Sequence, residues 1–467
     1  MQFTSLEFFI FLAVVLFLYY VVPQKYRNYV ILFASYYFYF SLKAEYIVIL
    51  IASTLLNYIL GRLIEKDIVH KRLYLSISLI FNIGILFFFK YLNFFSGQLN
   101  LLFSKFSLNI NLPTHSLILP IGISYYTLMA IGYILDVYWG DIPAQKNYII
   151  FSNYLAFFPQ IMSGPIGRAK SLFKQFNEKH PFLYVNMSNG LRLILWGLFK
   201  KMVIADPIGD YVNAVYNNIP MHSSLTLIFT ALLYPFQLYT DFSGYTDIAR
   251  GVAKLLGFNL MVNFRAPYVH STSVTEFWHR YHISLTSWLR EYIFYPFMGT
   301  HTEKKRIYEG ILLIFLISGF WHGASWMFII WGLFQAFYLI SEEALKINAK
   351  KFIKFPQKQL HKIITYLLLS FSFLFFRLPN MDSFNLFIKT LFGKPGPFYI
   401  GNLGTLCTFI LGLMILISIE LLLNKKQFDE WIGDKKPGFR YAIYLSISLI
   451  IILFGSINGS SFIYFQF

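Results

Sequence analysis

The sequence predicts an all-α protein that crosses a membrane several times. Apolar residues make up 57% of its 467 residues and aromatic residues 20%, whereas charged residues make up only 13%. Long uncharged runs recur from one end to the other, and a soluble domain cannot bury that much apolar surface. We therefore expect one integral membrane domain over residues 1–467, in the inner or plasma membrane, with residues 455–467 forming a C-terminal tail on the outer side.

The charge and the cysteine count limit the classes of partner. The formal net charge is +17, but the basic residues cluster in short loops between apolar runs. Such loops are typical of cytoplasmic membrane edges and of contact with anionic lipids, so we expect membrane lipids and not nucleic acid as partners. Cys407 is the single cysteine, which excludes a disulfide framework and a cysteine-based metal site. We expect no bound metal.

The first third predicts helices that alternate across the membrane. The run Leu6–Val22 has no basic residue before it and no cleavage site after it, so it is not a cleavable signal peptide. Lys25 and Arg27 follow it, which predicts an outside N-terminus. The loop 62–72 is basic and should lie inside, whereas Ser96–His115 should lie outside. The next apolar runs are Tyr29–Phe40, Tyr46–Leu60 and Leu73–Phe89.

The middle of the chain predicts short and broken helices. Prolines 120, 159, 165 and 235 interrupt its apolar runs, and several runs are shorter than the roughly 20 residues that a spanning helix needs. Broken helices at membrane depth occur only where they face protein or a cavity, so we expect re-entrant segments around a central cavity. Lys170–Lys179 and Lys200-Lys201 suggest cytoplasmic edges. The runs are Leu117–Leu135, Ile149–Ile161, Leu191–Val203 and Leu225–Tyr239.

The last third has a clearer topology. The lysine-rich segment Lys346–Lys362 should lie inside, and Ile363–Phe376 then leads out. Leu403–Leu423 returns to the basic loop Lys425–Arg440, and Tyr441–Phe454 leads out again to the uncharged tail.

His322 is the strongest single candidate for chemistry. It is the only ionisable group in the apolar stretch Leu312–Leu333. An ionisable side chain at membrane depth is costly, and imidazole moves protons near neutral pH. The segment Ile311–Ile340 is too long for one comfortable span, so we expect a hairpin of two short helices with Ser318–Ser325 near its turn. The alternative is a histidine that only makes a hydrogen bond between helices.

The segment Ser273–Glu291 reads as an amphipathic helix. Ser273 and Glu276 have the spacing of a capping box. Arg280 and Arg290 share one face and are placed to meet an anion at a membrane surface. The alternative is an interfacial anchor helix with a packed histidine. The opposite face carries Trp278, His282, Leu285 and Leu289.

Two acids lie in the largely apolar stretch 235–251. Asp241 and Asp247 need partners or water at that depth, and arginines such as Arg250 or Arg265 could supply them. We expect structural pairing to be their role.

Together these clusters resemble the membrane-bound O-acyltransferase family, and within it the bacterial branch that acylates cell-envelope polysaccharides such as alginate and peptidoglycan. The resemblance covers nearly the whole chain, and its motifs occur in family order. One minor departure is Tyr281, where alginate-type members usually have tryptophan. The matching stretches are Phe158–Ile166, Tyr239–Gly251, Asn263–Tyr268, Glu276–Arg290 and Ser318–Trp326.

The resemblance implies a fold and a set of site residues. The family fold is a ring of tilted transmembrane and re-entrant helices around a central tunnel. The family's membrane histidine falls on His322, and its second, helix-borne polar residue falls on His282. The tail residues 462–467 are similar to an aromatic pattern, Phe-x-Tyr-x-x-Phe, which some systems of this branch carry on a small partner protein. This likeness implies Tyr464 as a transient acyl acceptor, and the alternative is an apolar end packed at the membrane interface.

The implied activity is O-acetylation of a cell-envelope or secreted polysaccharide. Acetyl-CoA is the expected donor, as a substrate and not as a permanently bound cofactor, with Arg280 and Arg290 near its phosphates. His322 would act as general base, and His282 would orient the donor or stabilise developing charge. A periplasmic or surface acetyltransferase or esterase-like protein would pass the group to the polysaccharide acceptor. The alternatives are D-alanyl transfer to teichoic acids, a proton-coupled polysaccharide exporter, and a non-catalytic scaffold.

Overall fold

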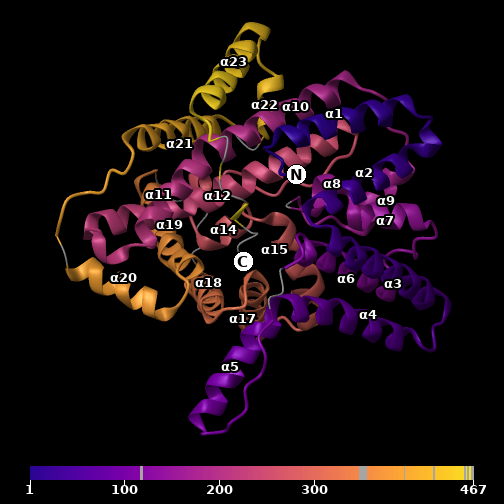
Figure 1. The fold of residues 1–467 in the computed structure, drawn as a ribbon, viewed down its shortest axis with the longest axis horizontal. Helices are drawn as coiled ribbons and strands as arrows, with labels where there is room; N and C mark the ends of the chain where they lie inside the picture. Colours follow the sequence, from indigo (N-terminus) through magenta and orange to yellow (C-terminus); the bar gives the residue numbers. More distant parts are fainter. Residues whose placement is uncertain are drawn as a thin grey trace. The chain divides into compact units, whose positions relative to one another are not determined.

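The computed structural model describes residues 1–115, 119–162, 164–346, 355–393, 395–423, 426–456, 459 and 462–463. Their secondary structure is α-helix with short 3-10 and π-helical stretches, and no strand occurs among them, which confirms the all-α prediction (Figure 1). Within the described residues, five helices are long and apolar enough to cross a membrane. The protein is therefore a multi-pass membrane protein.

The chain forms two compact units. The first comprises Met1–Asn186 and Ala253–Leu260, and the second comprises Met187–Val252 and Met261–Phe467. In the first unit α3, α4 and α6 run side by side (Figure 1). The helices of this unit are α1 (Leu6–Val21), α2 (Arg27–Leu42), α3 (Ile47–Lys66), α4 (Lys71–Leu86), α5 (Leu92–Lys105), α6 (Ile123–Trp139), α7 (Tyr148–Ala156), α8 (Phe158–Ile161) and α9 (Ala169–Asn177).

A buried polar network joins α3 to α4. The side-chain amide of Asn82 donates to Asn57 Oδ1 at 2.9 Å, and Ser78 Oγ donates to the same oxygen at 2.7 Å. These side chains are at most 1% exposed. Hydrogen bonds of this kind hold membrane helices together where the hydrophobic effect cannot. After α4 the helical path continues through a π-helical stretch, Phe87–Tyr91, to the end of α5, because no proline interrupts it.

The second unit contains the candidate site. Most of α10 and α12 belongs to it, together with every helix that follows them. Its helices are α10 (Tyr184–Leu198), α11 (Asp206–Tyr216), α12 (Ser224–Leu255), α13 (Pro267–His270), α14 (Val274–Trp278), α15 (Ile283–Leu289), α16 (Tyr295–Met298), α17 (Lys304–His322), α18 (Trp326–Ala344), α19 (Phe355–Arg377), α20 (Met381–Gly393), α21 (Leu403–Leu423), α22 (Phe428–Gly433) and α23 (Pro437–Phe454).

The expectation that Pro235 interrupts a span is wrong. Helix α12 runs continuously through Pro235 for 32 residues. Proline removes one helical hydrogen bond and disturbs the carbonyls of the preceding turn. Side-chain hydroxyls from elsewhere in the unit satisfy backbone oxygens there, because Tyr366 donates to Leu232 O and Tyr268 donates to Pro235 O. The tertiary contacts therefore keep the helix intact.

The predicted hairpin at His322 is confirmed, but its two helices, α17 and α18, are 19 residues each and not short. Helices α17 and α18 lie side by side, and the turn between them spans residues 323–325 (Figure 1). Glycine permits their close approach, because a Cβ on Gly319 would overlap the carbonyl oxygen of Phe328 and one on Gly332 would overlap that of Phe315. The hairpin therefore places His322 at the C-terminal end of α17.

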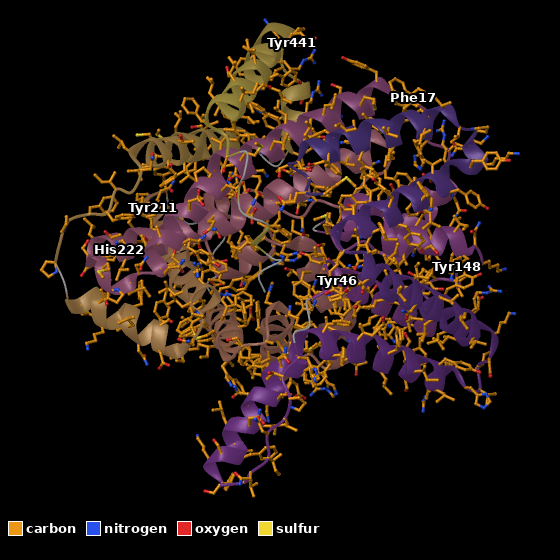
Figure 2. The ribbon with its side chains drawn as sticks, viewed as in Figure 1. Phe17, Tyr46, Tyr148, Tyr211, His222 and Tyr441 are labelled. Atoms are coloured by element: carbon orange, nitrogen blue, oxygen red, sulfur yellow. The ribbon has the colours of Figure 1, made fainter. Side chains whose placement is uncertain are left out.

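Apolar side chains cover the outer faces of the membrane helices. Phe17 on α1 is 66% exposed and Tyr441 on α23 is 60% exposed, and both are labelled in Figure 2. Such exposure suits contact with lipid. The single domain over residues 1–467 and the ring of helices around a tunnel stay predictions.

Candidate active site

His322 lies in an aromatic cage. Its ring centroid is 5.0 Å from that of Trp321, 5.2 Å from that of Trp331 and 5.1 Å from that of Phe376. These rings come from α17, α18 and α19. His322 is 5% exposed. The imidazole therefore lies inside the second unit and does not face lipid.

The predicted continuous helix 273–291 is wrong, because the chain breaks at residues 279–282. Helix α14 ends at Trp278, and His282 adopts a left-handed conformation with φ 48° and ψ 48° before α15 begins. The cause is Asn263, whose backbone oxygen accepts from the Ile283 amide and whose Oδ1 accepts from the Ser284 amide, each at 3.0 Å. These bonds replace those of a continuous helix. A left-handed non-glycine residue costs energy and often marks a functional site.

The N-terminal cap of this segment behaves largely as expected. Ser273 Oγ accepts from the Glu276 amide at 3.0 Å. The Glu276 carboxylate reaches the amide and hydroxyl of Thr272, at 3.0 and 2.9 Å, one residue before the position that a capping box predicts. The four side chains predicted to share a face are all buried, although the helix is broken between them: Trp278, His282, Leu285 and Leu289.

The structure brings the two predicted histidines to the same tryptophan. The His282 ring is 6.2 Å from Trp321, the neighbour of His322, and 4.6 Å from Phe242 on α12. His282 is 1% exposed. The two imidazoles therefore belong to one buried aromatic cluster, which is an arrangement that excludes bulk water.

Two adjacent lysines form buried ion pairs with α12. Lys200 Nζ lies 2.6 Å from Asp247 Oδ2, and Lys201 Nζ lies 2.7 Å from both Asp241 Oδ1 and Asp206 Oδ1. The lysines are 2% and 1% exposed, so they are buried within the protein, and their place at a cytoplasmic edge stays a prediction. They lie in a π-helical stretch, Phe199–Ala205, and such stretches are frequent at functional sites.

The ion pairs confirm part of the predicted pairing of the two acids. Asp247 also contacts Arg250, at 3.2 Å, as the sequence suggested. Asp241 pairs with Lys201, and not with either arginine considered for it.

Glycines let the lysine-bearing helix approach α12. A Cβ on Gly197 would lie 2.5 Å from the carbonyl oxygen of Gly244, and one on Gly251 would lie 2.6 Å from that of Gly190. Small residues at matching positions allow backbones to come this close in membrane proteins. This packing brings Lys200 and Lys201 within reach of the acids on α12.

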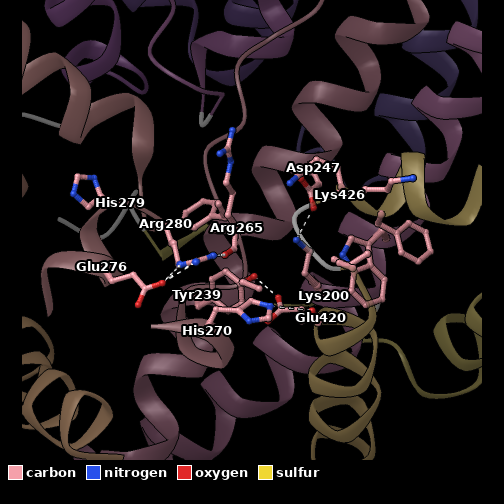
Figure 3. Close-up of a pocket in the computed structure, with 16 residues that line it drawn as sticks. Lys200, Tyr239, Asp247, Arg265, His270, Glu276, His279, Arg280, Glu420 and Lys426 are labelled. Atoms are coloured by element: carbon pink, nitrogen blue, oxygen red, sulfur yellow. Dashed lines mark hydrogen bonds and ion pairs between the residues drawn. The ribbon is translucent and has the colours of Figure 1, made fainter. Parts of the chain in front are cut away.

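A charged pocket of about 360 Å³ lies beside these ion pairs (Figure 3). Figure 3 shows the Lys200–Asp247 pair on one side and the Arg280–Glu276 pair, at 2.8 Å, on the other. Between them Tyr239 donates to the Glu420 carboxylate. The remaining charged or titratable lining residues are Arg265, His270, His279 and Lys426.

Arg265 is the cation that the pocket leaves available for an anion. Lys200, Arg280 and Lys426 each pair with a carboxylate, and Lys426 does so with Asp434 at 2.5 Å. Arg265 is exposed, and its guanidinium contacts no carboxylate within the described part of the chain. Because Lys426 belongs to the basic loop predicted to lie inside, we expect the pocket to open toward the cytoplasm.

The directions of three pKa shifts set the charge of His279, His270 and Glu276 in the pocket at pH 7. Burial lowers the pKa of His279, and the nearby Arg290 lowers it further. Burial also lowers the pKa of His270. Burial alone would raise the pKa of Glu276, but hydrogen bonds from Thr272 and Arg280 outweigh it and hold the pKa below its usual value. Both imidazoles are therefore neutral and Glu276 is ionised at pH 7.

Of the other predicted site residues that the structure describes, only one lines the pocket. Arg280 lines the pocket, whereas Arg290 is not among the lining residues. Tyr464 lies outside the described residues. No group of three or more histidine, cysteine, aspartate or glutamate side chains that could hold a metal occurs in the part of the chain that the structure describes.

Sequence reasoning missed Lys200, Lys201, Tyr239 and Glu420. A usable signal existed for the lysines, since they interrupt an apolar run that continues to Ala205 and is followed by Asp206. Ionisable groups inside such a run need partners in the protein. Nothing comparable marked Tyr239, because tyrosines are abundant throughout this chain.

Comparisons with known proteins identify the family of the chain. A model of the membrane-bound O-acyltransferase family (MBOAT) matches residues 142–379. The chain is 38% identical to a protein named "probable alginate O-acetylase AlgI" from Azotobacter vinelandii, over 82% of this chain and 76% of that one. It is 33% identical to a peptidoglycan O-acetyltransferase of Helicobacter pylori, over 78% and 73% respectively. A teichoic acid D-alanyltransferase of Bacillus subtilis is 30% identical over 56% of this chain and 70% of that one.

Proposed function

The chain belongs to the membrane-bound O-acyltransferase family and is an O-acyltransferase, and from this premise we propose that it transfers acetyl groups for O-acetylation of a cell-envelope or secreted polysaccharide. The donor is cytoplasmic acetyl-CoA. The alginate and peptidoglycan relatives, whose names specify acetyl transfer, support acetyl as the acyl group.

The observation that carries the proposal is the placement of His322 and His282 in one buried cluster. Both rings pack against Trp321, and the cluster belongs to the same unit as the charged pocket. A thioester bound in that pocket would meet a cationic rim with its phosphates, and we propose that its acyl end extends from there to the dry cluster that contains the two histidines.

Donor binding falls to the pocket. Arg265 offers a guanidinium to a phosphate, which is a strong charge-assisted contact. Arg280 is fixed by Glu276 and contributes positive charge at the same rim. Arg290 acts at longer range, since it does not line the pocket.

His322 acts as the general base. As the acceptor hydroxyl attacks the thioester carbonyl, its proton passes to the imidazole, and the resulting imidazolium returns a proton to the departing sulfur when the C–S bond breaks. Such general base catalysis contributes roughly 10²- to 10⁴-fold in rate. His282 orients the donor or stabilises charge that develops on the carbonyl oxygen. The aromatic cage keeps water from hydrolysing the intermediate.

Tyr464 is the proposed first acceptor. A phenol has an unperturbed pKa of about 10, so it needs a base to attack at neutral pH. The aryl ester that forms is a reactive acyl donor. A periplasmic or surface acetyltransferase or esterase-like partner then passes the acetyl group to a polysaccharide hydroxyl.

The donor identity is tested with the purified full-length protein. Acetyl-CoA that carries label in the acetyl group should release free CoA and leave label on the protein, or on polymer when partner and polymer are added. Release only from a D-alanyl carrier protein would favour the second candidate, D-alanyl transfer, which the 30% identity to the Bacillus subtilis relative supports. Sugar flux driven by a pH gradient, without thioester turnover, would instead indicate an exporter.

A further inference from the structure

The last described residues of the chain enter the buried interior of the second unit. Phe462 is 0% exposed and Ile463 is 5% exposed. The Phe462 ring lies 4.6 Å from that of Tyr245 and 5.8 Å from that of Phe242. Phe242 in turn contacts His282 at 4.6 Å. The C-terminal segment is therefore one aromatic ring away from a predicted catalytic histidine.

Asp241 holds this segment by its backbone. The amide of Ile463 donates to Asp241 Oδ2 at 2.7 Å, and the bond is buried. The other carboxylate oxygen of Asp241 is bound to Lys201, which also binds Asp206. The side chains of this cluster are 2–4% exposed. A carboxylate in such a position requires full pairing, and the tail amide supplies part of it.

Two further contacts attach the C-terminal segment near the π-helical stretch that carries Lys201. The Ser456 amide donates to Met202 O at 3.0 Å, next to Lys201 in sequence. Gly459 passes so close to Asp206 that a Cβ at this position would overlap its carboxylate. Ser456 therefore contacts the π-helical stretch Phe199–Ala205, and Gly459 and Ile463 contact the two acids that pair with Lys201.

We propose that Asp241, fixed by Lys201 and Asp206, is a positioning residue that docks the C-terminal segment of this chain at a set depth beside His282. Every residue except proline has a backbone N–H, so the hydrogen bond to Asp241 sets how far the segment enters without selecting a side chain. The rings of Tyr245 and Phe242 around Phe462 select an aromatic side chain at that position. Ile463 is the sequence neighbour of Tyr464, so loss of the dock should impair acetylation of the proposed acceptor. The docking rests on the contacts alone, whereas its role in transfer rests on the proposed function.

Cysteine labelling measures the docking without reference to activity. Cys407 is the only native cysteine, so a Cys407→Ser, Ile463→Cys protein carries one thiol at the docked position and keeps the Ile463 backbone amide. We expect slow reaction with maleimide in the folded, detergent-solubilised protein. Adding Asp241→Ala should raise the labelling rate at least about tenfold. Adding Asp241→Asn should raise it much less, because the amide oxygen still accepts the hydrogen bond.

Two controls separate docking from loss of fold. Asp382→Ala removes an exposed aspartate of α20 that no hydrogen bond or ion pair joins to the described tail residues, and it should leave labelling slow. Gly459→Ala keeps every acid and lysine but pushes the tail from Asp206, and it should speed labelling. All variants must elute as single species and unfold cooperatively. The docking would be overturned if Asp241→Ala and Gly459→Ala were both labelled as slowly as the protein with the native residues at these positions.

Acetyl transfer is measured on the same variants without the added cysteine. If Asp241→Ala frees the tail and also stops transfer to the protein, the docking serves the proposed reaction. Fast labelling with unchanged transfer would uphold the docking and overturn its role in the reaction. Failure of the docking and failure of its role in acetyl transfer therefore give different results.

Discussion

Single residues show which part of the chemistry the sequence reveals. His322 stood out because no other ionisable group shares its apolar stretch, and the structure places it inside an aromatic cage. The sequence assigned Lys200 and Lys201 to a cytoplasmic edge but did not show that they are buried in ion pairs, because a basic pair beside an apolar run usually marks a membrane edge. Their burial depends on acids that lie about forty residues away in α12, and a single sequence does not show such distant pairing.

Arg265→Ala tests the donor pocket. Loss of a guanidinium that binds a donor phosphate should raise the KM for acetyl-CoA about tenfold to a hundredfold with kcat nearly unchanged, because the contact is equally strong in ground and transition states. The measurement is steady-state CoA release. Arg72→Ala, which removes an exposed arginine of α4 that does not line the pocket, is the control. An unchanged KM in the Arg265 variant would remove Arg265 from the donor site.

Glu276 gives a pH-dependent prediction. Its pKa is lower in the folded protein than in the unfolded chain, so ionisation of this group stabilises the fold above the unfolded pKa of about 4.5, and the effect is lost as pH falls through the folded pKa. Glu276→Gln should therefore lower the Tm in detergent at pH 6–8, and the difference from wild type should shrink below about pH 4.5. A Tm difference that stays constant down to pH 4 would contradict this account.

At the level of elements, the length and composition of apolar segments predicted the helices more reliably than local sequence patterns did. The α17–α18 hairpin followed from an apolar segment too long for one span. The break at residues 279–282 did not, because Asn263 takes over the backbone bonds from outside the segment. The continuity of α12 at Pro235 was likewise missed, since it depends on hydroxyls of Tyr366 and Tyr268.

Close helix packing at glycine gives the element-scale prediction. Gly197→Ala should destabilise the protein by about 1–3 kcal/mol, since its new methyl group meets the backbone of Gly244 on α12. Thermal unfolding in one detergent measures the effect. Gly84→Ala on α4 is the matched control, because a Cβ there meets nothing within 4 Å. Equal Tm values for the two variants would show that this contact does not limit helix approach.

For the whole molecule, composition predicted the class and the basic loops predicted the orientation. The helical spans confirm the class. The sequence could not show which helices form each compact unit or that the tail returns to the core, because both depend on contacts between distant segments.

Cys407 reports the orientation directly. It is exposed near the start of α21 and borders a groove of about 540 Å³ that also contains Asn402 and Thr405. The basic loops predict that this end lies outside, so a membrane-impermeant maleimide should label intact cells at Cys407. In a Cys407→Ser background, Gly438→Cys in the basic loop should be labelled only after permeabilisation. The reverse pattern would invert the topology and move the charged pocket away from cytoplasmic thioesters.

The most direct test of the central claim is the rate of acetyl-CoA turnover by purified full-length protein with and without His322. With partner and polymer present, His322→Ala should lower CoA release roughly 10²- to 10⁴-fold while the Tm and the affinity for CoA stay near those of the wild type. A folded His322→Ala protein that releases CoA at the wild-type rate would contradict acyl transfer at this buried imidazole.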